Sequence, residues 1–288
     1  MIRAYDAPDV LLDLHLDLGE GPSWDAATGR LSFVDILAGR VYIANAERIV
    51  DVLEVGAHVG AALPAEGGGF LVARRDGFVR LGDDASQEPV ALPLADQPDL
   101  RFNDGKCDPT GRAWAGTLPY QDAPGRGALY RLVGGEAVVA VTGVGLSNGL
   151  GWSPDARLMY LVDSRAGHLD VFDFDAATGS PGARRTLVDL AGEAGVPDGM
   201  CVDAEGCPWV AIWDGSEVRR YAPDGRQLGA IPMPVSRPTS CCFIDDVLVI
   251  TSAAHGLGDD LARQPHAGAI FAIRPGVSGP DATPWVRT

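Results

Sequence analysis

The sequence predicts an all-β fold, a six-bladed β-propeller in which residues 1–288 form a single domain. Three observations lead to this prediction. A tight turn recurs about every 40 to 50 residues, short strand-like runs lie between the turns, and helical periodicity is hard to find. A repeat of this length with four short strands is typical of a propeller blade, so six copies of the turn predict six blades.

The recurring turn is rich in Asp, Pro and Gly. Aspartate accepts hydrogen bonds from nearby backbone N–H groups, and glycine takes positive φ without steric cost. The copies cover residues 24–30, 64–68, 108–112, 153–157 and 203–206, with a weaker copy at 243–246. The same turns are compatible with an alternative all-β fold, a pair of β-sandwiches.

Strand-like runs follow several of these turns. They mix β-branched and aromatic residues with small or polar ones, as strands do. The clearest runs are residues 30–35, 69–73, 157–162 and 247–251. The best candidate for a helix, residues 184–191, is short and is soon interrupted by Gly192.

The two ends of the chain carry further strand-like runs. Residues 10–14 lie near the N-terminus and residues 269–273 near the C-terminus. Pairing between them would close the ring of blades and remove its free strand edges. We therefore expect the two ends to meet in one blade.

The net charge excludes several classes of function. The chain has 23 Lys and Arg residues against 39 Asp and Glu residues, which gives a net charge of −16. An acidic protein lacks the cationic surface that binds nucleic acid or anionic membranes. No apolar run approaches the roughly 18 to 20 residues that span a bilayer. The N-terminus also lacks the apolar stretch of a signal peptide.

Cysteine usage indicates a reducing compartment. The five cysteines are an odd number and contain no CxxC pair. We interpret them as reduced thiols, and we expect a cytoplasmic protein.

Several common catalytic motifs are absent or out of context. Ser147 stands in a G-x-S-x-G match, but the next segment leads into a turn and a strand instead of the helix that a nucleophile elbow requires. No phosphate-binding loop precedes a helix. The five histidines lack zinc-binding spacing.

A set of polar residues in glycine-bearing loops remains. In a propeller such loops converge on the central channel, and carboxylate and amide oxygens suit a hard divalent cation. The set consists of Glu20, Arg101, Asn103, Asp104, Asn148 and Asp198. Asn-Gly and Asp-Gly pairs are also common turn formers, so each such pair alone is compatible with a simple turn. Glu20 has no special turn chemistry.

These loops resemble the SMP-30/gluconolactonase family. The resemblance covers nearly the full length and lies in residues 18–24, 101–106, 108–109, 111–112, 115–117, 147–150, 197–201, 209–211 and 239–243. It implies a six-bladed propeller with a divalent metal in the central channel. It also implies hydrolysis of sugar lactones.

The resemblance assigns roles to individual residues. It implies that Glu20, Asn148 and Asp198 bind the metal and that Asp198 is also the general base. Arg101 and Asn103 correspond to positions that contact substrate. We expect Ca²⁺, with Mg²⁺, Mn²⁺ or Zn²⁺ as alternatives. The metal would polarise the lactone carbonyl and lower the pKa of a bound water.

One segment departs from the family pattern. Members most similar to this chain carry two glutamates after the segment equivalent to residues 115–117, and one of them contacts substrate. Here Tyr120 and Gln121 stand in their place. We expect Gln121 to hydrogen-bond a sugar hydroxyl without contributing charge, which changes substrate identity more than reaction type.

Two other functions remain open from the sequence. A propeller with one cation is compatible with a non-enzymatic calcium-binding regulator, and a propeller hydrolase acting on a phosphotriester or another ester is a third reading. We expect a small-molecule sugar lactone as partner and no nucleic acid or membrane. The sequence does not indicate the oligomeric state.

Overall fold

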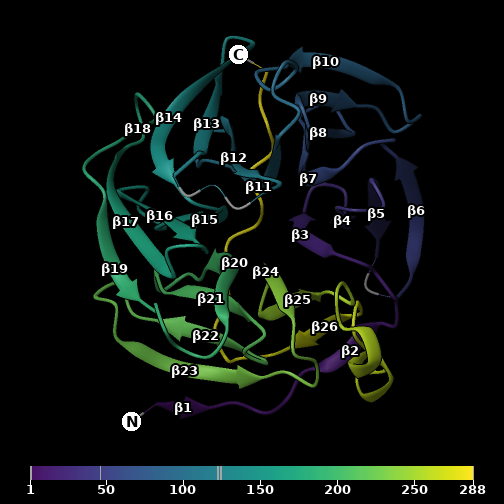
Figure 1. Ribbon diagram of the computed structural model, residues 1–288, viewed down its shortest axis with the longest axis vertical. Helices are drawn as coiled ribbons and strands as arrows, with labels where there is room; N and C mark the ends of the chain where they lie inside the picture. Colours follow the sequence, from purple (N-terminus) through teal and green to yellow (C-terminus); the bar gives the residue numbers. More distant parts are fainter. Residues whose placement is uncertain (1, 46, 122, 124, 288) are drawn as a thin grey trace.

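The computed structural model describes residues 2–45, 47–121, 123 and 125–287. Its strands form six sheets, which radiate from one central axis as the blades of a propeller (Figure 1). The predicted six-bladed β-propeller is therefore confirmed. In the described part of the chain, the one helical segment is the short 3-10 helix η1 (Gly258–Arg263), and no helix there is long and apolar enough to cross a membrane.

Each blade is numbered in chain order, and its innermost strand lies nearest the axis. Blade 1 contains β3 (Gly19–Asp25), β4 (Arg30–Asp35), β5 (Arg40–Ala44) and β6 (Ile49–Glu54). Blade 2 contains β7 (Val59–Pro64), β8 (Phe70–Arg74), β9 (Gly77–Leu81) and β10 (Gln87–Ala91). Blade 3 contains β11 (Leu100–Cys107), β12 (Ala113–Pro119), β13 (Gly127–Val133) and β14 (Glu136–Val144).

The second half of the ring is built in the same way. Blade 4 contains β15 (Ser147–Trp152), β16 (Leu158–Asp163), β17 (His168–Asp175), β18 (Ser180–Pro181) and β19 (Arg185–Asp189). Blade 5 contains β20 (Val196–Val202), β21 (Pro208–Trp213), β22 (Glu217–Tyr221), β23 (Gln227–Pro232) and β1 (Arg3–Ala4). Blade 6 contains β24 (Pro238–Ile244), β25 (Val247–Ser252), β26 (Ile270–Ile273) and β2 (Asp9–Leu12).

The predicted turns and the predicted strand-like runs each occupy a constant position in the repeat. Each turn links the innermost strand of a blade to its second strand, and the four predicted runs lie on second strands. The helix candidate at residues 184–191 is wrong, because its centre forms β19, which pairs antiparallel with β17. The outer edge of β17 offers unpaired backbone groups there, and the Thr186–Val188 segment satisfies them as a strand.

The ring is closed by the N-terminal segment. Strand β2 pairs antiparallel with β26, with Val10 opposite Phe271, so a strand near the N-terminus and the last strand in chain order share blade 6. Strand β1 then adds in parallel to β23 of blade 5. The predicted pairing of the two chain ends is confirmed.

A second closure comes from the C-terminal strap, residues 276–287, which crosses the ring as the yellow trace in Figure 1. Its backbone hydrogen bonds to the turns of blades 5, 6, 1, 2 and 3 are 2.7 to 3.2 Å long. They join Ser278 to Ala204, Gly279 to Asp245, Ala282 to Trp24, Trp285 to Pro64, and Val286 to Gly111. The strap therefore lies over the end of the channel where these turns gather.

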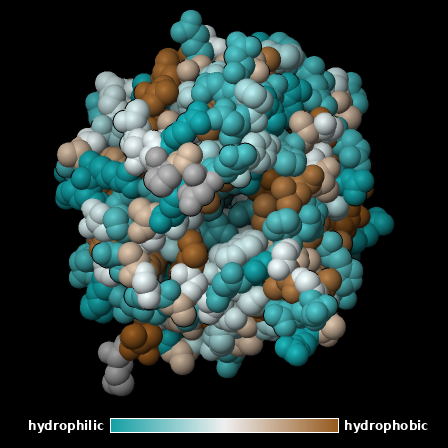
Figure 2. Space-filling model, viewed as in Figure 1, coloured by the Kyte–Doolittle hydropathy of each residue, from teal (hydrophilic) through white to brown (hydrophobic). Residues whose placement is uncertain are grey.

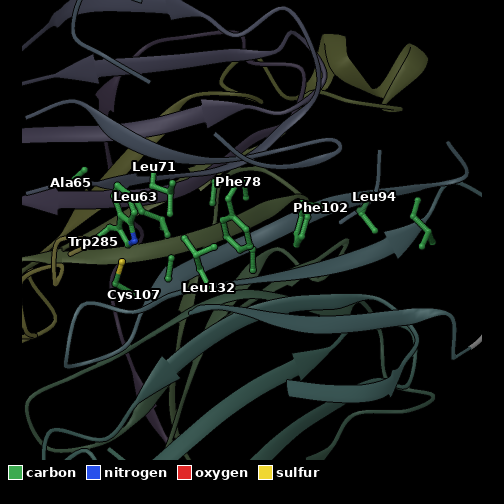
Figure 3. Packing of buried hydrophobic residues seen from close by; sticks show 14 residues of the cluster. Leu63, Ala65, Leu71, Phe78, Leu94, Phe102, Cys107, Leu132 and Trp285 are labelled. Atoms are coloured by element: carbon green, nitrogen blue, oxygen red, sulfur yellow. The ribbon is translucent and has the colours of Figure 1, made fainter. Parts of the chain in front are cut away.

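The hydrophobic core is divided among the interfaces between neighbouring blades. Between blades 2 and 3, Leu71, Phe102 and Leu132 pack in one buried cluster, and Trp285 of the strap enters it (Figure 3). Trp285 is 5% exposed. The strap is thus anchored by an aromatic side chain as well as by backbone hydrogen bonds. All five cysteines are free and buried.

Replacing the anchor tests the contribution of the strap to stability. We expect Trp285→Ala to lower the free energy of unfolding by about 3 to 5 kcal/mol, because it leaves a large cavity between two blades. Chemical denaturation followed by circular dichroism measures this change. Arg287→Ala is the control, since its ion pair with Glu88 is exposed, and its effect should stay within about 0.5 kcal/mol. Equal stability of Trp285→Ala and wild type would contradict this account.

Candidate metal and substrate site

The innermost strands share an irregularity at the channel. Strand pairing shifts register between Glu20 and Ser23 in β3 and between Pro197 and Met200 in β20, and every other innermost strand has a similar shift near its start. A register irregularity re-aims side chains out of the regular alternation. Five of the sequence candidates lie at these irregularities: Glu20, Asn103, Asp104, Asn148 and Asp198.

The strands approach so closely here that particular residues must be glycine. A Cβ atom on Gly60 would lie 1.8 Å from the carbonyl oxygen of Asn103. A Cβ atom on Gly149 would lie 2.7 Å from the carbonyl oxygen of Asp198. Both distances are shorter than van der Waals contact, so neighbouring blades meet backbone to backbone at the level of the candidate residues.

Hydrogen bonds link several candidates directly. The Asn148 amide donates to a carboxylate oxygen of Asp198 and, at 3.1 Å, to the Ser164 hydroxyl. Arg101 Nη1 donates to Asn103 Oδ1 at 2.8 Å, and Asn103 Nδ2 donates to the Ser147 carbonyl at 3.1 Å. These hydrogen bonds identify the nitrogen and the oxygen of the Asn103 and Asn148 side-chain amides.

One consequence is an unsatisfied acceptor. Because Asn148 Nδ2 makes both of these bonds, the side-chain oxygen of Asn148 is buried without a hydrogen-bond partner among the described residues. A buried polar atom without a partner is costly in a folded protein. An oxygen in this position suits a cation.

The carboxylates at the channel are also poorly compensated. Burial raises the pKa of Glu20 well above its usual range, and the nearby carboxylates of Asp198 and Asp104 raise it further. Burial and then the charge of Asp104 likewise raise the pKa of Asp198. Burial also raises the pKa of Asp104, against the opposing effect of Lys106. Three buried carboxylates thus share one region, and an added positive charge would favour their ionised forms.

A single guanidinium lies among these acids. Burial lowers the pKa of Arg101 to about 10, although Glu20 and Asp198 are among the charges that oppose this shift. Since that value is still above neutrality, Arg101 is cationic there. Its one positive charge leaves the cluster with an excess of acid.

The donor set fits an oxygen-preferring divalent cation. Glu20 and Asp198 supply carboxylates from blades 1 and 5, and Asn148 supplies its unsatisfied amide oxygen from blade 4. Among the described residues, no group of three or more His, Cys, Asp or Glu side chains is arranged to hold a metal ion. A cation here would therefore depend on the amide oxygen as well as on the two carboxylates.

Buried aspartates at the ends of two second strands position this set. Asp35 accepts hydrogen bonds from the backbone N–H groups of Asp17 (2.9 Å) and Leu18 (3.3 Å), just before Glu20. Asp35 is the last residue of β4, so these hydrogen bonds hold the segment before β3 against β4.

Asp163 does the same in blade 4. It ends β16 and accepts hydrogen bonds from the N–H groups of Gly145 (3.0 Å) and Leu146 (3.1 Å), just before Asn148. Arg184 donates to the same carboxylate at 3.1 Å. Two of the three candidate ligands therefore follow segments held by an equivalent buried aspartate.

The mouth of the channel carries a pair that the sequence did not reveal. His58 Nδ1 and the Tyr120 hydroxyl are 2.8 Å apart, although the residues are 62 positions apart in the chain. Burial lowers the pKa of His58, and the charges of Arg101 and Arg75 lower it further. These effects favour the neutral form of His58, whose ring nitrogen can accept a hydrogen bond from the Tyr120 hydroxyl. In the view of Figure 2 the middle of the ring is hollowed, with both hydrophilic and hydrophobic residues around it.

The remaining sequence candidates differ in their placement. Gln121 is exposed beyond the end of β12, and no hydrogen bond joins its side chain to the described part of the cluster. Ser147 begins strand β15, so the helix that a nucleophile elbow requires is absent at this point. Lys106 Nζ donates to the Met200 carbonyl at 2.9 Å, a structural contact between blades 3 and 5.

The positioning aspartates had a weak signal in the sequence. Both close an apolar run with the same dipeptide, Val34-Asp35 and Val162-Asp163. Asp104 adjoins Asn103 in a loop that the sequence had singled out, yet only the structure shows its charge acting on Glu20 and Asp198.

Fold and site together define a class of protein: a six-bladed propeller with acidic and amide side chains gathered at one level of its channel. The sequence model of a protein family, described as the SMP-30/gluconolactonase/LRE-like region, matches residues 18–254. The chain belongs to this family, as the sequence motifs predicted.

Relatives and solved structures agree with this assignment. The chain is 38% identical to regucalcin of Xenopus laevis over 269 residues, covering 89% of this chain and 90% of the relative. It is 38% identical to human regucalcin over 271 residues, covering 88% and 90%.

Among solved structures, a protein from Agrobacterium tumefaciens described as a calcium-binding protein, regucalcin, has a TM-score of 0.94 and 28% identity, covering 99% of this chain and 100% of that one. A gluconolactonase from Xanthomonas campestris shares the fold, with a TM-score of 0.71, 22% identity, and coverage of 94% and 88%.

Substitution of a positioning aspartate tests how the site is built. In Asp163→Asn, one side-chain oxygen becomes an amide donor that faces backbone N–H groups. We expect unfolding to become easier by about 1 to 3 kcal/mol and Ca²⁺ affinity to fall by about 10- to 100-fold. Thermal denaturation and calorimetric titration measure the two effects. Asp173→Asn is the control, because its ion pair with Arg185 is exposed. Unchanged Ca²⁺ binding in Asp163→Asn would show that Asn148 is positioned by other contacts.

Proposed function

We propose that this protein is a metal-dependent lactonase that hydrolyses a sugar lactone at the channel site. Membership of the SMP-30/gluconolactonase/LRE-like family supports the reaction class. The observation that carries the proposal for this chain is the buried oxygen of Asn148, which lacks a partner beside the acids Glu20 and Asp198.

The proposed ligands of the cation are Glu20, Asn148 and Asp198. Ca²⁺ is the first choice, because all three offer hard oxygen donors and because the relative from Agrobacterium tumefaciens is described as calcium-binding. Mg²⁺, Mn²⁺ and Zn²⁺ are alternatives for the assay. When bound, the cation supplies Lewis-acid polarisation of a carbonyl and acidification of water.

We assign the role of general base to Asp198. One of its carboxylate oxygens accepts the Asn148 amide, which fixes the orientation of the group. The carboxylate would then take a proton from the attacking water at its other oxygen.

Arg101 and Asn103 act as a unit on the substrate. Arg101 Nη1 is engaged by the Asn103 oxygen and by the Phe102 carbonyl, so its other N–H groups remain for substrate. They would stabilise negative charge that develops on the lactone oxygen and then the carboxylate of the product. Asn103, held by the Ser147 carbonyl, keeps the guanidinium in place.

The side chains at the channel mouth would determine which substrates bind. Tyr120 and neutral His58 offer aromatic faces and a hydroxyl, and neither carries negative charge. An exposed Gln121 stands beside them as an uncharged partner for a sugar hydroxyl. This wall favours a polyhydroxylated, uncharged lactone over a cationic one.

A non-enzymatic calcium-binding role is the second candidate. The name regucalcin and the description calcium-binding, which its relatives carry, favour it. A calcium-binding regulator would use the same three proposed ligands, but it would give Arg101 and Asn103 no function. Turnover therefore distinguishes the two functions. No observation on the channel residues favours the third reading, a phosphotriester or other ester.

The decisive assay combines lactones with metals. Metal-free protein is mixed with Ca²⁺, Mg²⁺, Mn²⁺ or Zn²⁺ and with a panel of aldonolactones that includes gluconolactone, and acid release is followed with a pH indicator. We expect metal-dependent turnover with at least one lactone. A calcium-binding regulator would bind Ca²⁺ without turnover under any combination, and that result would reject the lactonase.

Two substitutions separate metal binding from catalysis. We expect Asp198→Ala to lose both metal binding and hydrolysis, because it removes a ligand and the base together. Arg101→Ala should retain the metal and lose about 100-fold or more in kcat, as loss of an oxyanion donor does in other enzymes. Asp259→Ala, an exposed acid in η1, is the control. Wild-type turnover by Asp198→Ala would contradict the mechanism.

A further inference from the structure

The opposite end of the channel holds a cavity of about 200 Å³. It is lined by the later halves of the innermost strands and by residues 280–283 of the C-terminal strap. Glu20, Asn148 and Asp198 do not line it. In β3, β15 and β20 the lining residues come after Glu20, Asn148 and Asp198 along the strand, so the cavity lies beyond these residues along the axis.

The wall of this cavity is mainly apolar. Trp24, Trp152 and Phe243 contribute aromatic rings, and Leu63 and Val202 contribute aliphatic side chains. Proline rings from the recurring turns complete the wall. Such surfaces favour a compact apolar molecule over a polyhydroxylated sugar, which would lose its hydration without replacement hydrogen bonds.

One hydrogen-bond donor faces this region without a full set of acceptors. Lys106 lines the cavity, and its ammonium donates to the Met200 carbonyl. An ammonium has three N–H donors, so it can serve a further acceptor.

The charges around the cavity oppose a charged occupant of either sign. Asp104 at its inner end and Asp281 on the strap disfavour an anion, whereas Lys106 disfavours a cation. A neutral molecule avoids both penalties and can still accept a hydrogen bond.

We propose that the strap end of the channel is a second binding site, which takes a small uncharged molecule with an aromatic or branched apolar body and a hydrogen-bond-accepting carbonyl oxygen. Its size suits a single ring, because a cavity of about 150 Å³ holds benzene in another protein. The carbonyl accepts from Lys106, and the ring packs against the aromatic wall. The site is independent of the proposed lactonase reaction.

A charge series of three single-ring probes tests the site. Acetophenone, benzoate and benzylamine share a ring and differ in charge, and each is titrated into the Ca²⁺-loaded protein by calorimetry, with saturation-transfer NMR as a second readout. We expect saturable 1:1 binding of acetophenone with a Kd of about 1 mM, as suits so small a ligand. Benzoate and benzylamine should bind at least about tenfold more weakly. No saturable binding of acetophenone, or equal binding of all three probes, would overturn the proposal.

Variants locate the binding within the cavity. Ala282→Trp places a large ring on the half-buried strap residue that lines the cavity and should abolish acetophenone binding. Lys106→Met removes the donor while retaining most of its bulk, and it should weaken binding about tenfold. This variant keeps the test valid if Ala282→Trp does not fold.

Arg101→Ala separates the two ends of the channel. It should bind acetophenone as the wild type does, because Arg101 does not line the cavity. Loss of acetophenone binding in Arg101→Ala, with full binding in Ala282→Trp, would place the probe in the lactone site and overturn the proposal. A failed lactone assay would leave this result unaffected.

Discussion

The structure depends on the close approach of six innermost strands around one axis. Gly60 and Gly149 allow neighbouring backbones to meet there, at distances that any Cβ atom would prevent. Strand pairing cannot stay regular at such a point, and each innermost strand shifts its register. The side chains at those shifts leave the alternation of the sheet and face the axis. The same packing constraint that builds the ring therefore also assembles its polar centre.

That centre is electrostatically costly unless something positive joins it. Glu20, Asp104 and Asp198 are buried together, and Arg101 offsets only part of their charge. Groups that only stabilise a fold are usually paired with partners, as Asp203 is with Trp209 and Arg220 in blade 5. The contrast between Asp203, which is paired with a cation within its blade, and the acids at the axis, which share Arg101, is consistent with the functional role proposed for Glu20 and Asp198.

Much of this could be predicted from the sequence because the repeat is local. The turns at Gly29, Gly111 and Gly206 each mark the end of an innermost strand, and glycine-flanked polar residues mark its start. Contacts between distant segments had no such signal. The pair of His58 and Tyr120 joins two blades across 62 positions, and the strap has neither alternation nor a helical period. Strand β19 was missed for a related reason, since the unpaired edge of β17, not its own sequence, determines its conformation.

Blade 6, in which β2 pairs with β26, has a consequence for synthesis on the ribosome. Strand β2 is made well before its partner β26, which ends at Ile273. At about 5 to 20 residues per second the early strand waits for roughly a quarter of a minute to a minute. As their strands emerge during that interval, blades 1 to 5 can form an open arc with two unpaired faces. The nascent chain therefore remains exposed to aggregation or chaperone binding until β26 emerges.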